Sequence, residues 1–430
     1  MLIYESQVTA ISFCEELFMK EYLITYKFGM LATAGLALLM YLIGKWIVGK
    51  VSFLRKYYIP IPVVGGLIFA FLNLALNLTG VADLTFETTV QTIAMSLFFT
   101  SVGYMASLSD LKKGGIGVVL LLACTAGLIV VQNGVGVGLC ALFGVDLRAG
   151  VLVGSVPYTG GNGTAAAWGP QLAEQGLEYA VALGVAAATV GLVMGGLLGG
   201  PVARRLMKKA RQKAGSESGA ETAAAGEQKK AGLDYKSLLN VFIILFICMG
   251  VSEILNPWFA DLLHKISENL TLPSYILSMI LAMIVRNVQE LAFKQKIHTP
   301  ESDKIGDLSL QVFLSIALTT LNLAALFNKE VAKVGLVLLV SIPVQAIVVA
   351  LYVSFVTFNV MGRDYDAVVI SCGHCGYGLG ATPTAIANMD TFCKKNGKSI
   401  KAYLTVPIVG ALFLDFANAL LIALFVSLVS

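Results

Sequence analysis

The sequence predicts an all-α polytopic membrane protein, and three observations lead to that prediction. Charged residues make up 13% of the chain, about half the share carried by an ordinary soluble domain. Hydrophobic residues make up 57%, and the mean hydropathy is +0.81. The apolar residues gather in blocks of about twenty, the length at which a helix crosses a bilayer core of roughly 30 Å. Water is therefore not the main solvent of this chain.

Charged residues or Pro and Gly separate the apolar blocks, and we expect about five spans on each side of a polar interval. The first half is predicted to contain spans at 28–49, 61–82, 89–106, 116–143 and 179–202. The second half is predicted to contain spans at 238–255, 273–293, 308–327, 334–361 and 402–428. A single block is also compatible with a buried helix of a soluble protein, but so long a series is not.

The polar interval has the composition of a linker. Residues 206–235 are rich in Ala, Gly, Ser, Glu and Lys, which bury too little apolar surface to fold alone. We therefore expect an N-terminal segment at 1–27, a first transmembrane repeat at 28–205, a flexible linker at 206–235 and a second transmembrane repeat at 236–430. Residues 1–27 lack the basic region and cleavage site of a signal peptide, so this segment is expected to be retained.

The distribution of Lys and Arg predicts the orientation. Basic residues at the start of the linker, including Arg204, Arg205 and Lys208, place it in the cytoplasm. The segment 83–87, expected as an outer loop, contains no Lys or Arg. Both termini are then outside, and about five spans in each half give the two halves opposite topology. The net charge of +4 is small and dispersed, so nothing supports nucleic-acid binding.

An internal repeat relates the two halves. Residues 90–97 resemble residues 310–317, and each stretch is followed by a polar turn and a long apolar block. Each of these blocks carries a glutamine near its middle, Gln132 in the first half and Gln345 in the second. We therefore predict two inverted repeats of about five helices each.

A segment broken by Gly and Pro follows the glutamine block in each half. We expect re-entrant segments at 147–172 and 364–393, centred on Gly160 and Gly378. Such paired breaks point to a transporter binding site, because unwound backbone at membrane depth persists only where protein, water or ligand satisfies it. Opposite topology brings the two hairpins in from opposite faces, so their tips are expected to meet near the midplane. The alternative is that these glycines only permit close helix packing.

The second glycine segment, residues 373–389, resembles the bacterial glutamate:sodium symporter family. The likeness covers nearly all of the chain outside the N-terminal segment and the linker. Further matching positions are Gln132-Asn133, the segment 160–164, Tyr365-Asp366-Ala367, the segment 406–411 and Asp415. One position departs from the pattern, because Asn162 stands where members of the family carry His.

The resemblance implies sodium-coupled symport of L-glutamate across the cytoplasmic (inner) membrane, with sodium as coupling ion, no other cofactor and no enzymatic activity. It also implies an elevator-type homodimer, in contact with membrane lipid, with a scaffold part and a mobile part that carries the hairpins. Another carboxylate or amino-acid cargo, or proton coupling, is compatible with the same fold. A channel is disfavoured, because two occluding hairpins suit alternating access better than a continuous pore.

Glutamate requires donors for two carboxylates, and half-helix N-termini at the hairpin tips offer such donors. Arg286 could pair with a substrate carboxylate, or its side chain could extend to the interface. The substrate-binding candidates are Thr159, Gly160, Gly161, Asn162, Gly163, Thr164, His374, Gly378, Gly380, Ala381, Thr382 and Arg286.

Sodium prefers hard oxygen ligands, and five polar residues inside apolar blocks offer them. These sodium candidates are Gln132, Asn133, Gln345, Asp415 and Asn418. An ionised carboxylate at the position of Asp415, in the middle of an apolar run, costs about 2.5–3.5 kcal/mol on insertion scales. A functional role is therefore the first hypothesis for this residue, and a structural hydrogen bond is the second.

His374, Cys372 and Cys375 also permit two other interpretations. All three side chains are good zinc ligands, although positions so close in sequence rarely reach one ion together. A cysteine nucleophile with a histidine base would instead indicate an intramembrane enzyme. His374 could also contact the substrate or hold its hairpin in place, and its titration would then make transport depend on pH.

Overall fold

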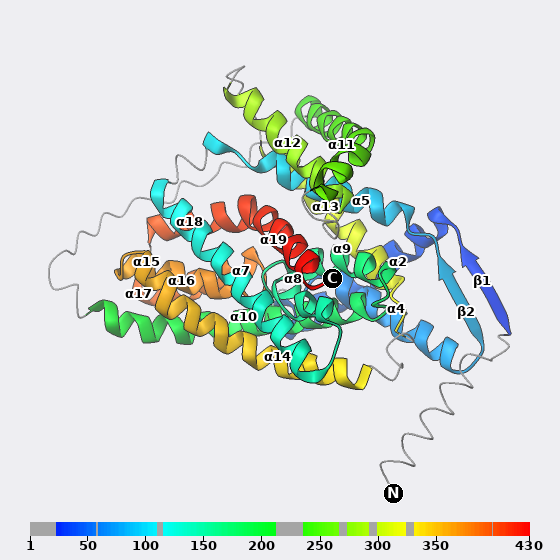
Figure 1. The fold of residues 1–430 in the computed structure, drawn as a ribbon, viewed down its shortest axis with the longest axis horizontal. Coiled ribbons are helices and arrows are strands. Elements are labelled where there is room, and N and C mark those ends of the chain that lie inside the picture. The colour runs from blue at the N-terminus through cyan, green and yellow to red at the C-terminus, as the bar shows by residue number, and fades with distance from the viewer. Residues whose placement is uncertain are drawn as a thin grey trace, which may run out of the picture.

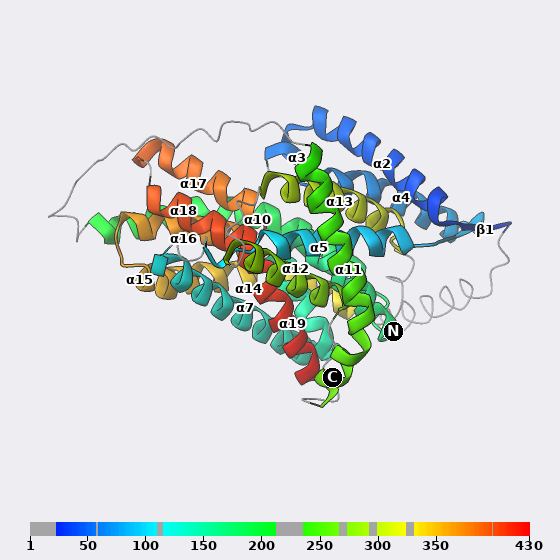
Figure 2. The same ribbon diagram turned by 90° about the horizontal axis from the view of Figure 1, so that it is seen from above.

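The structure, a computed structural model, describes residues 23–56, 59–109, 115–211, 235–265, 273–291, 299–323, 331–397 and 399–430. Helices dominate this part of the chain, and they fall into two groups that lie side by side (Figures 1 and 2). Most of the expected N-terminal segment and residues 212–234 of the expected linker lie outside the described residues.

The first group, here called the scaffold group, occupies the upper right of Figure 1. Its helices pack mainly on one another, with α5 and α13 at the centre. It comprises β1 (Ile24–Phe28), α2 (Met30–Lys50), α3 (Ser52–Lys56), α4 (Ile61–Leu78), β2 (Ala82–Phe86), α5 (Thr89–Met105), α11 (Tyr235–His264), α12 (Ser274–Leu291) and α13 (Thr299–Thr319).

The second group, here called the hairpin group, carries both glycine-rich segments. Its part from the first half comprises α7 (Gly115–Phe143), η1 (Leu147–Val153), α8 (Ser155–Tyr158), α9 (Gly161–Glu174) and α10 (Ala180–Arg211). Its part from the second half comprises α14 (Val331–Tyr352), η3 (Val353–Thr357), α15 (Phe358–Val360), α16 (Tyr365–Tyr377), α17 (Thr382–Asn396), α18 (Ile400–Ile408), η4 (Val409–Phe413) and α19 (Leu414–Val429). The two groups meet where α9 lies against α13.

Every predicted span overlaps a helix, although the span at 308–327 extends past the end of α13 at Thr319. Seven helices of the described residues are long and apolar enough to cross a membrane, which confirms the polytopic prediction. The other three are α5, which has 17 residues, α12, which carries Arg286 and Glu290, and α13. Helix α13 begins at Thr299, ahead of the predicted 308. The predicted start is too late because the first turns of the helix hold charged residues such as Glu301 and Lys304. An apolar window does not detect such a polar helix start.

Two predicted boundaries are wrong in the structure. Residues 206–211, expected in the linker, continue α10, because Val202, Leu206 and Ala210 remain on one buried face at helical spacing. The expected outer loop at 83–87 and the end of the expected N-terminal segment are strands instead. Strands β1 and β2 pair in parallel from Ile24 with Ala82 to Phe28 with Phe86. Strands of five residues are too short to be recognised in a sequence that is dominated by helical patterns.

Glycines let several scaffold helices approach each other closely. A Cβ at Gly65 of α4 would overlap the backbone carbonyl of Met40 on α2, and a Cβ at Gly103 of α5 would overlap the carbonyl of Met279 on α12. Gly35, on α2, has open space around it. Gly65 and Gly103 therefore depend on the absence of a side chain, whereas Gly35 does not.

We expect Gly65→Ala to lower the thermal unfolding temperature of the purified protein, because overpacking against backbone costs about 1–3 kcal/mol. Gly35→Ala is the matched control on the facing helix. It should be neutral or stabilising by up to about 1 kcal/mol, since Ala is the better helix former. Equal unfolding temperatures for the two variants would contradict the close approach of α2 and α4.

Candidate functional site

Each glycine-rich segment folds as a helical hairpin that begins at a capping aspartate. The Asp146 carboxylate accepts a hydrogen bond from the Arg148 backbone N–H at 2.9 Å, and the Asp364 carboxylate accepts one from the Ala367 N–H at 2.7 Å. Hydrogen bonds from the Arg148 side chain also hold the pKa of Asp146 below its usual range. The first helical turn of each segment is thus capped in the same way, by an aspartate side chain.

The first hairpin reaches its tip between α8 and α9. Thr159 and Gly160 make the turn, and α9 starts at Gly161, whose φ of +67° is a conformation that glycine adopts without a steric cost. The side chains of Thr159, Asn162 and Thr164 are buried there. The first backbone N–H groups of α9 therefore lie inside the protein rather than in water, and no side-chain cap satisfies them.

The second hairpin turns through 378–381 between α16 and α17. Pro383 stands in the first turn of α17, where its missing N–H costs nothing. The Thr382 hydroxyl donates to the Gly410 carbonyl oxygen at 2.8 Å, and Gly410 lies in the π-helical turn η4. A π turn releases backbone carbonyls from their usual partners and often marks a functional position.

The two tips meet. A Cβ at Gly161 would lie 3.0 Å from the Gly380 carbonyl oxygen, and one at Gly160 would lie 2.7 Å from the side-chain nitrogen of Asn418. Four elements, α9, the 378–381 turn, α19 and the end of α8, therefore converge on one point. The two hairpin tips are therefore in contact with each other.

The two mid-helix glutamines cross-link the halves at this point. Gln132 Nε2 donates to the Gly378 carbonyl oxygen at 2.7 Å, so a residue of the first half satisfies the second hairpin. Gln345 Nε2 donates to the carbonyl oxygens of Val153 at 3.0 Å and of Gln132 at 2.9 Å, so a residue of the second half satisfies the first hairpin. The Thr159 hydroxyl completes the network by donating to Gln132 Oε1 at 2.6 Å.

Two asparagines bind the backbone of Ser155, the first residue of α8. Asn133 Oδ1 accepts from the Ser155 backbone N–H at 2.8 Å, and Asn418 Nδ2 donates to the Ser155 carbonyl oxygen at 3.3 Å. The structure therefore brings together Gln132, Asn133, Gln345 and Asn418 with the first hairpin. Asp415, the fifth sodium candidate, is half-buried and lies one turn before Asn418 on α19, directly after η4.

Buried polar atoms without a partner gather in this region. Such an atom costs about 1–3 kcal/mol when it stays unpaired, so a concentration of them marks a place where a polar ligand or ion would be stabilised. The unpartnered atoms among these residues are Asn133 Nδ2, Ser155 Oγ, Asn162 Nδ2, Gln345 Oε1 and Asn418 Oδ1. They include both donors and acceptors.

Sequence reasoning missed the π turns η3 and η4. Pro407 inside α18 is the signal that could have indicated η4, because proline removes a helical hydrogen bond. No comparable residue announces η3 at 353–357. Ser155 was also missed, although it lies at the centre of the asparagine contacts.

His374 lies behind the tip of the second hairpin. Its Nδ1 hydrogen-bonds the Thr357 hydroxyl of η3 at 3.0 Å, and its ring stacks on Tyr377 with centroids 4.8 Å apart. Cys372 and Cys375 are buried free thiols. Within the described ranges, no group of three or more His, Cys, Asp and Glu side chains could hold a metal ion. His374 thus fixes α16 against η3.

Arg286 lies apart from the hairpin tips, on α12 of the scaffold group. It is 2% exposed and forms an ion pair with Glu290 at 2.6 Å, one helical turn further on. Its guanidinium also lies 5.9 Å from the centre of the Tyr104 ring. The structure therefore does not bring Arg286 together with the other candidates, and we leave it out of the proposed site.

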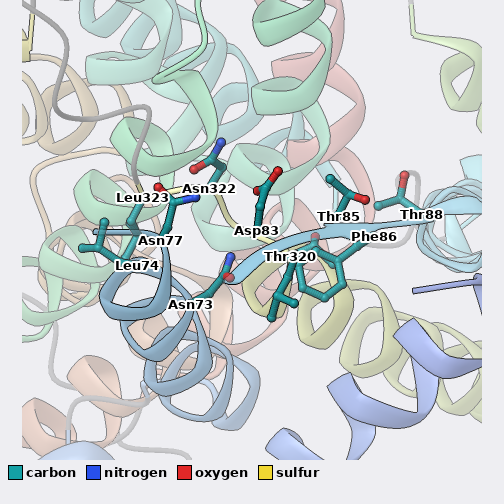
Figure 3. A pocket seen from close by; sticks show the side chains of 11 residues that line it. Asn73, Leu74, Asn77, Asp83, Thr85, Phe86, Thr88, Thr320, Asn322 and Leu323 are labelled. Atoms are coloured by element: carbon teal, nitrogen blue, oxygen red, sulfur yellow. The ribbon is translucent and has the colours of Figure 1, made fainter. Parts of the chain in front are cut away.

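A polar cavity of about 260 Å³ lies elsewhere, in the scaffold group (Figure 3). Asn73 and Asn77 line it from α4, Asp83 lines it from β2, and Thr320 and Asn322 line it from the segment after α13. None of its lining residues belongs to a hairpin. It is separate from the candidate site.

Two broken hairpins meet inside a bundle of apolar helices, and a residue of the opposite half holds each hairpin. This architecture is that of a polytopic membrane transporter. The family model described as sodium/glutamate symporter matches residues 26–398. The sodium/glutamate symporter of Escherichia coli is 38% identical over 401 residues, which are 93% of this chain and 97% of that protein. The one of Haemophilus influenzae is 36% identical over 404 residues, again 93% and 97%. The chain belongs to the sodium/glutamate symporter family, and it is a transporter rather than an enzyme.

We expect Gln132→Leu to destabilise the purified protein, because it leaves the Gly378 carbonyl and the Thr159 hydroxyl buried without their partner, at about 1–3 kcal/mol for each group. Thermal unfolding of the protein in detergent measures this effect. Gln311→Leu, on α13, is the matched control, since Gln311 Oε1 is a buried atom that already lacks a partner. A Gln132→Leu protein as stable as the control would contradict the cross-link.

Proposed function

We propose that this protein takes up L-glutamate together with sodium by alternating access across the cytoplasmic membrane. One observation carries the proposal: two broken hairpins meet tip to tip beside buried, unpartnered polar atoms of both signs. The relatives, which bear the name sodium/glutamate symporter, supply the identity of the cargo and of the coupling ion. The chain covers 97% of the length of each of these relatives.

The substrate is proposed to bind between the hairpin tips. The N-termini of α9 and α17 both begin there, and their free N–H groups and positive dipole ends favour carboxylates. Asn162 Nδ2 is an unpartnered donor at the same place. The contacts would come from Thr159, Gly160, Gly161, Asn162, Gly163, Thr164, Gly378, Gly380, Ala381 and Thr382, with His374 as a residue that positions α16.

Sodium is proposed to bind on the side of the tips formed by α7, α14 and α19. Gln345 Oε1 and Asn418 Oδ1 are unpartnered acceptors there, and Asp415 supplies a carboxylate near them on α19. Gln132 and Asn133 place further amide groups at the same point. Uncharged oxygens with one carboxylate suit a monovalent hard cation.

We infer that the two groups of helices move relative to each other as scaffold and elevator. Each half of the chain contributes helices to both groups, as two inverted repeats would. The matched aspartate caps and the reciprocal glutamine bonds support the same symmetry. With the basic end of α10 in the cytoplasm, both termini are proposed to lie outside. The scaffold group is proposed to form the contact between the two copies of a homodimer.

Uptake of labelled glutamate into proteoliposomes tests the proposed function. An inward sodium gradient should drive accumulation, and potassium or choline in its place should not. Each 100 mV of membrane potential adds roughly 2.3 kcal/mol per net positive charge moved. Accumulation driven by a proton gradient alone would favour the alternative coupling. Stronger competition by aspartate, citrate or malate than by unlabelled glutamate would favour another cargo.

Asp415→Asn should weaken the apparent sodium affinity in this assay by about ten- to a hundredfold, because a hydrogen bond or ligand contact to a charged group contributes about 1.5–3 kcal/mol. The stabilisation of the purified protein by sodium, measured by thermal unfolding, should shrink in parallel. Asp303→Asn, at an exposed position on α13, is the control. An unchanged sodium dependence of Asp415→Asn would remove this residue from the sodium site.

A further inference from the structure

A groove of about 510 Å³ runs between α10 and α17, on the side of the second hairpin. Helix α17 lines it with Thr384, Asn388, Thr391 and Lys395. The intervals between these positions are those of a single helix face, so the groove follows a continuous polar stripe. The stripe extends from Thr384 to Lys395, which corresponds to about 16 Å of helix.

Helix α10 lines the opposite wall with Gly196, Gly200 and Arg204, again at intervals of one helical turn. Small residues in adjacent helices normally bring the helices into contact, as Gly199 does with the side chain of Asn388. At Gly200, however, the nearest atom that a Cβ would meet is 3.9 Å away and belongs to Arg204. Gly200 therefore leaves open space beside the polar stripe.

The two ends of the groove differ. At the inner end, Thr384 lies two residues beyond the tip residue Thr382; it is 2% exposed, and its hydroxyl has no hydrogen-bond partner. At the outer end, Arg204 and Lys395 are both exposed, and neither has an acidic partner within the part of the chain that the structure describes. The groove thus leads from two unpaired cations to an unsatisfied hydroxyl beside the proposed substrate site.

We propose that this groove is the cytoplasmic path by which a small carboxylate anion, the transported glutamate, leaves and re-enters the hairpin tips. The inference deepens the proposed function and rests on it. Arg204 and Lys395 concentrate the anion at the mouth, since a cleft lined by one sign of charge raises the local concentration of the opposite sign. The hydroxyl and amide groups of the stripe replace its water along the way.

A phospholipid acyl chain is the competing occupant, because Leu192, Leu197 and Phe392 also line the groove. An acyl chain would leave the Thr384 hydroxyl buried without a partner, which costs free energy that a polar solute or its water would restore. The polar stripe runs the full length of the groove rather than only at its mouth. These observations favour the soluble carboxylate.

The test compares right-side-out with everted membrane vesicles from cells that express the protein, so that each face is assayed separately. Sodium-driven uptake of labelled glutamate is measured as a function of glutamate concentration on the outside of each kind of vesicle. The variant is the double substitution Arg204→Gln with Lys395→Gln. Its matched control is Arg205→Gln with Lys394→Gln, the neighbouring cations on the same two helices, which are exposed and lie outside the groove lining.

In everted vesicles the groove variant should show a KM about ten times higher, the low end of the effect of electrostatic focusing. High salt should raise the KM of the parent protein towards that of the variant, because it screens exposed charges. In right-side-out vesicles the KM should stay within a factor of about two, since the mouth lies on the other face. Thr384→Val should raise the KM in everted vesicles as well.

Four results would overturn the proposal. An equal effect of the control pair would indicate general surface charge, and an unchanged KM on both faces would leave the groove without a role. Loss of the effect in vesicles fused with an excess of phosphatidylcholine would indicate an anionic lipid. An effect confined to right-side-out vesicles would show that the groove opens outside. A failure of the proposed function itself looks different, because the parent protein would then show no sodium-driven uptake in either preparation.

Discussion

The hydrogen bond from Gln132 to the Gly378 carbonyl is the interaction on which the rest of the site depends. An unwound turn inside an apolar bundle exposes backbone groups that neither lipid nor a neighbouring apolar side chain can satisfy. A long amide side chain from the facing helix supplies the missing partner without a charge. Gln345 does the same for Val153 in the other hairpin. The reciprocal arrangement ties each hairpin to the opposite half, so a residue of one half stabilises the hairpin of the other.

The sequence predicts the parts of this fold that depend on composition and periodicity. Long apolar blocks are visible because a membrane span needs many consecutive apolar residues, and the hairpins are visible because Gly and Pro interrupt them. The strands β1 and β2, the early start of α13 and the helical continuation of α10 to Arg211 were not predictable in the same way. The strands are too short to give a clear pattern, the first turns of α13 are polar, and the end of α10 stays helical because Leu206 is buried against other elements of the hairpin group.

The candidate site shows the same division. Gln132, Asn133, Gln345 and Asn418 could be chosen from sequence because polar residues inside apolar blocks are rare, and the structure gathers them at the hairpin tips. Arg286 satisfied the same criterion, yet it is paired with Glu290 on the scaffold helix α12. A charged residue inside an apolar block gives the same sequence signal whether its partner is a substrate or a neighbour on its own helix. Only spatial contacts separate these two cases.

The unpartnered atoms at the tips connect the structure to coupled transport. Donors such as Asn162 Nδ2 and acceptors such as Asn418 Oδ1 are buried without protein partners, and each costs about 1–3 kcal/mol when it stays unpaired. In the proposed site, an anionic substrate would satisfy the donors and a cation would satisfy the acceptors, so either ligand alone would leave part of the cost in place. The proposed site would therefore be best satisfied with both ligands bound. If the hairpin group moves across the bilayer as proposed, it would move most readily in that doubly occupied state, because few buried groups would then stay unpaired, and this is the condition that symport requires.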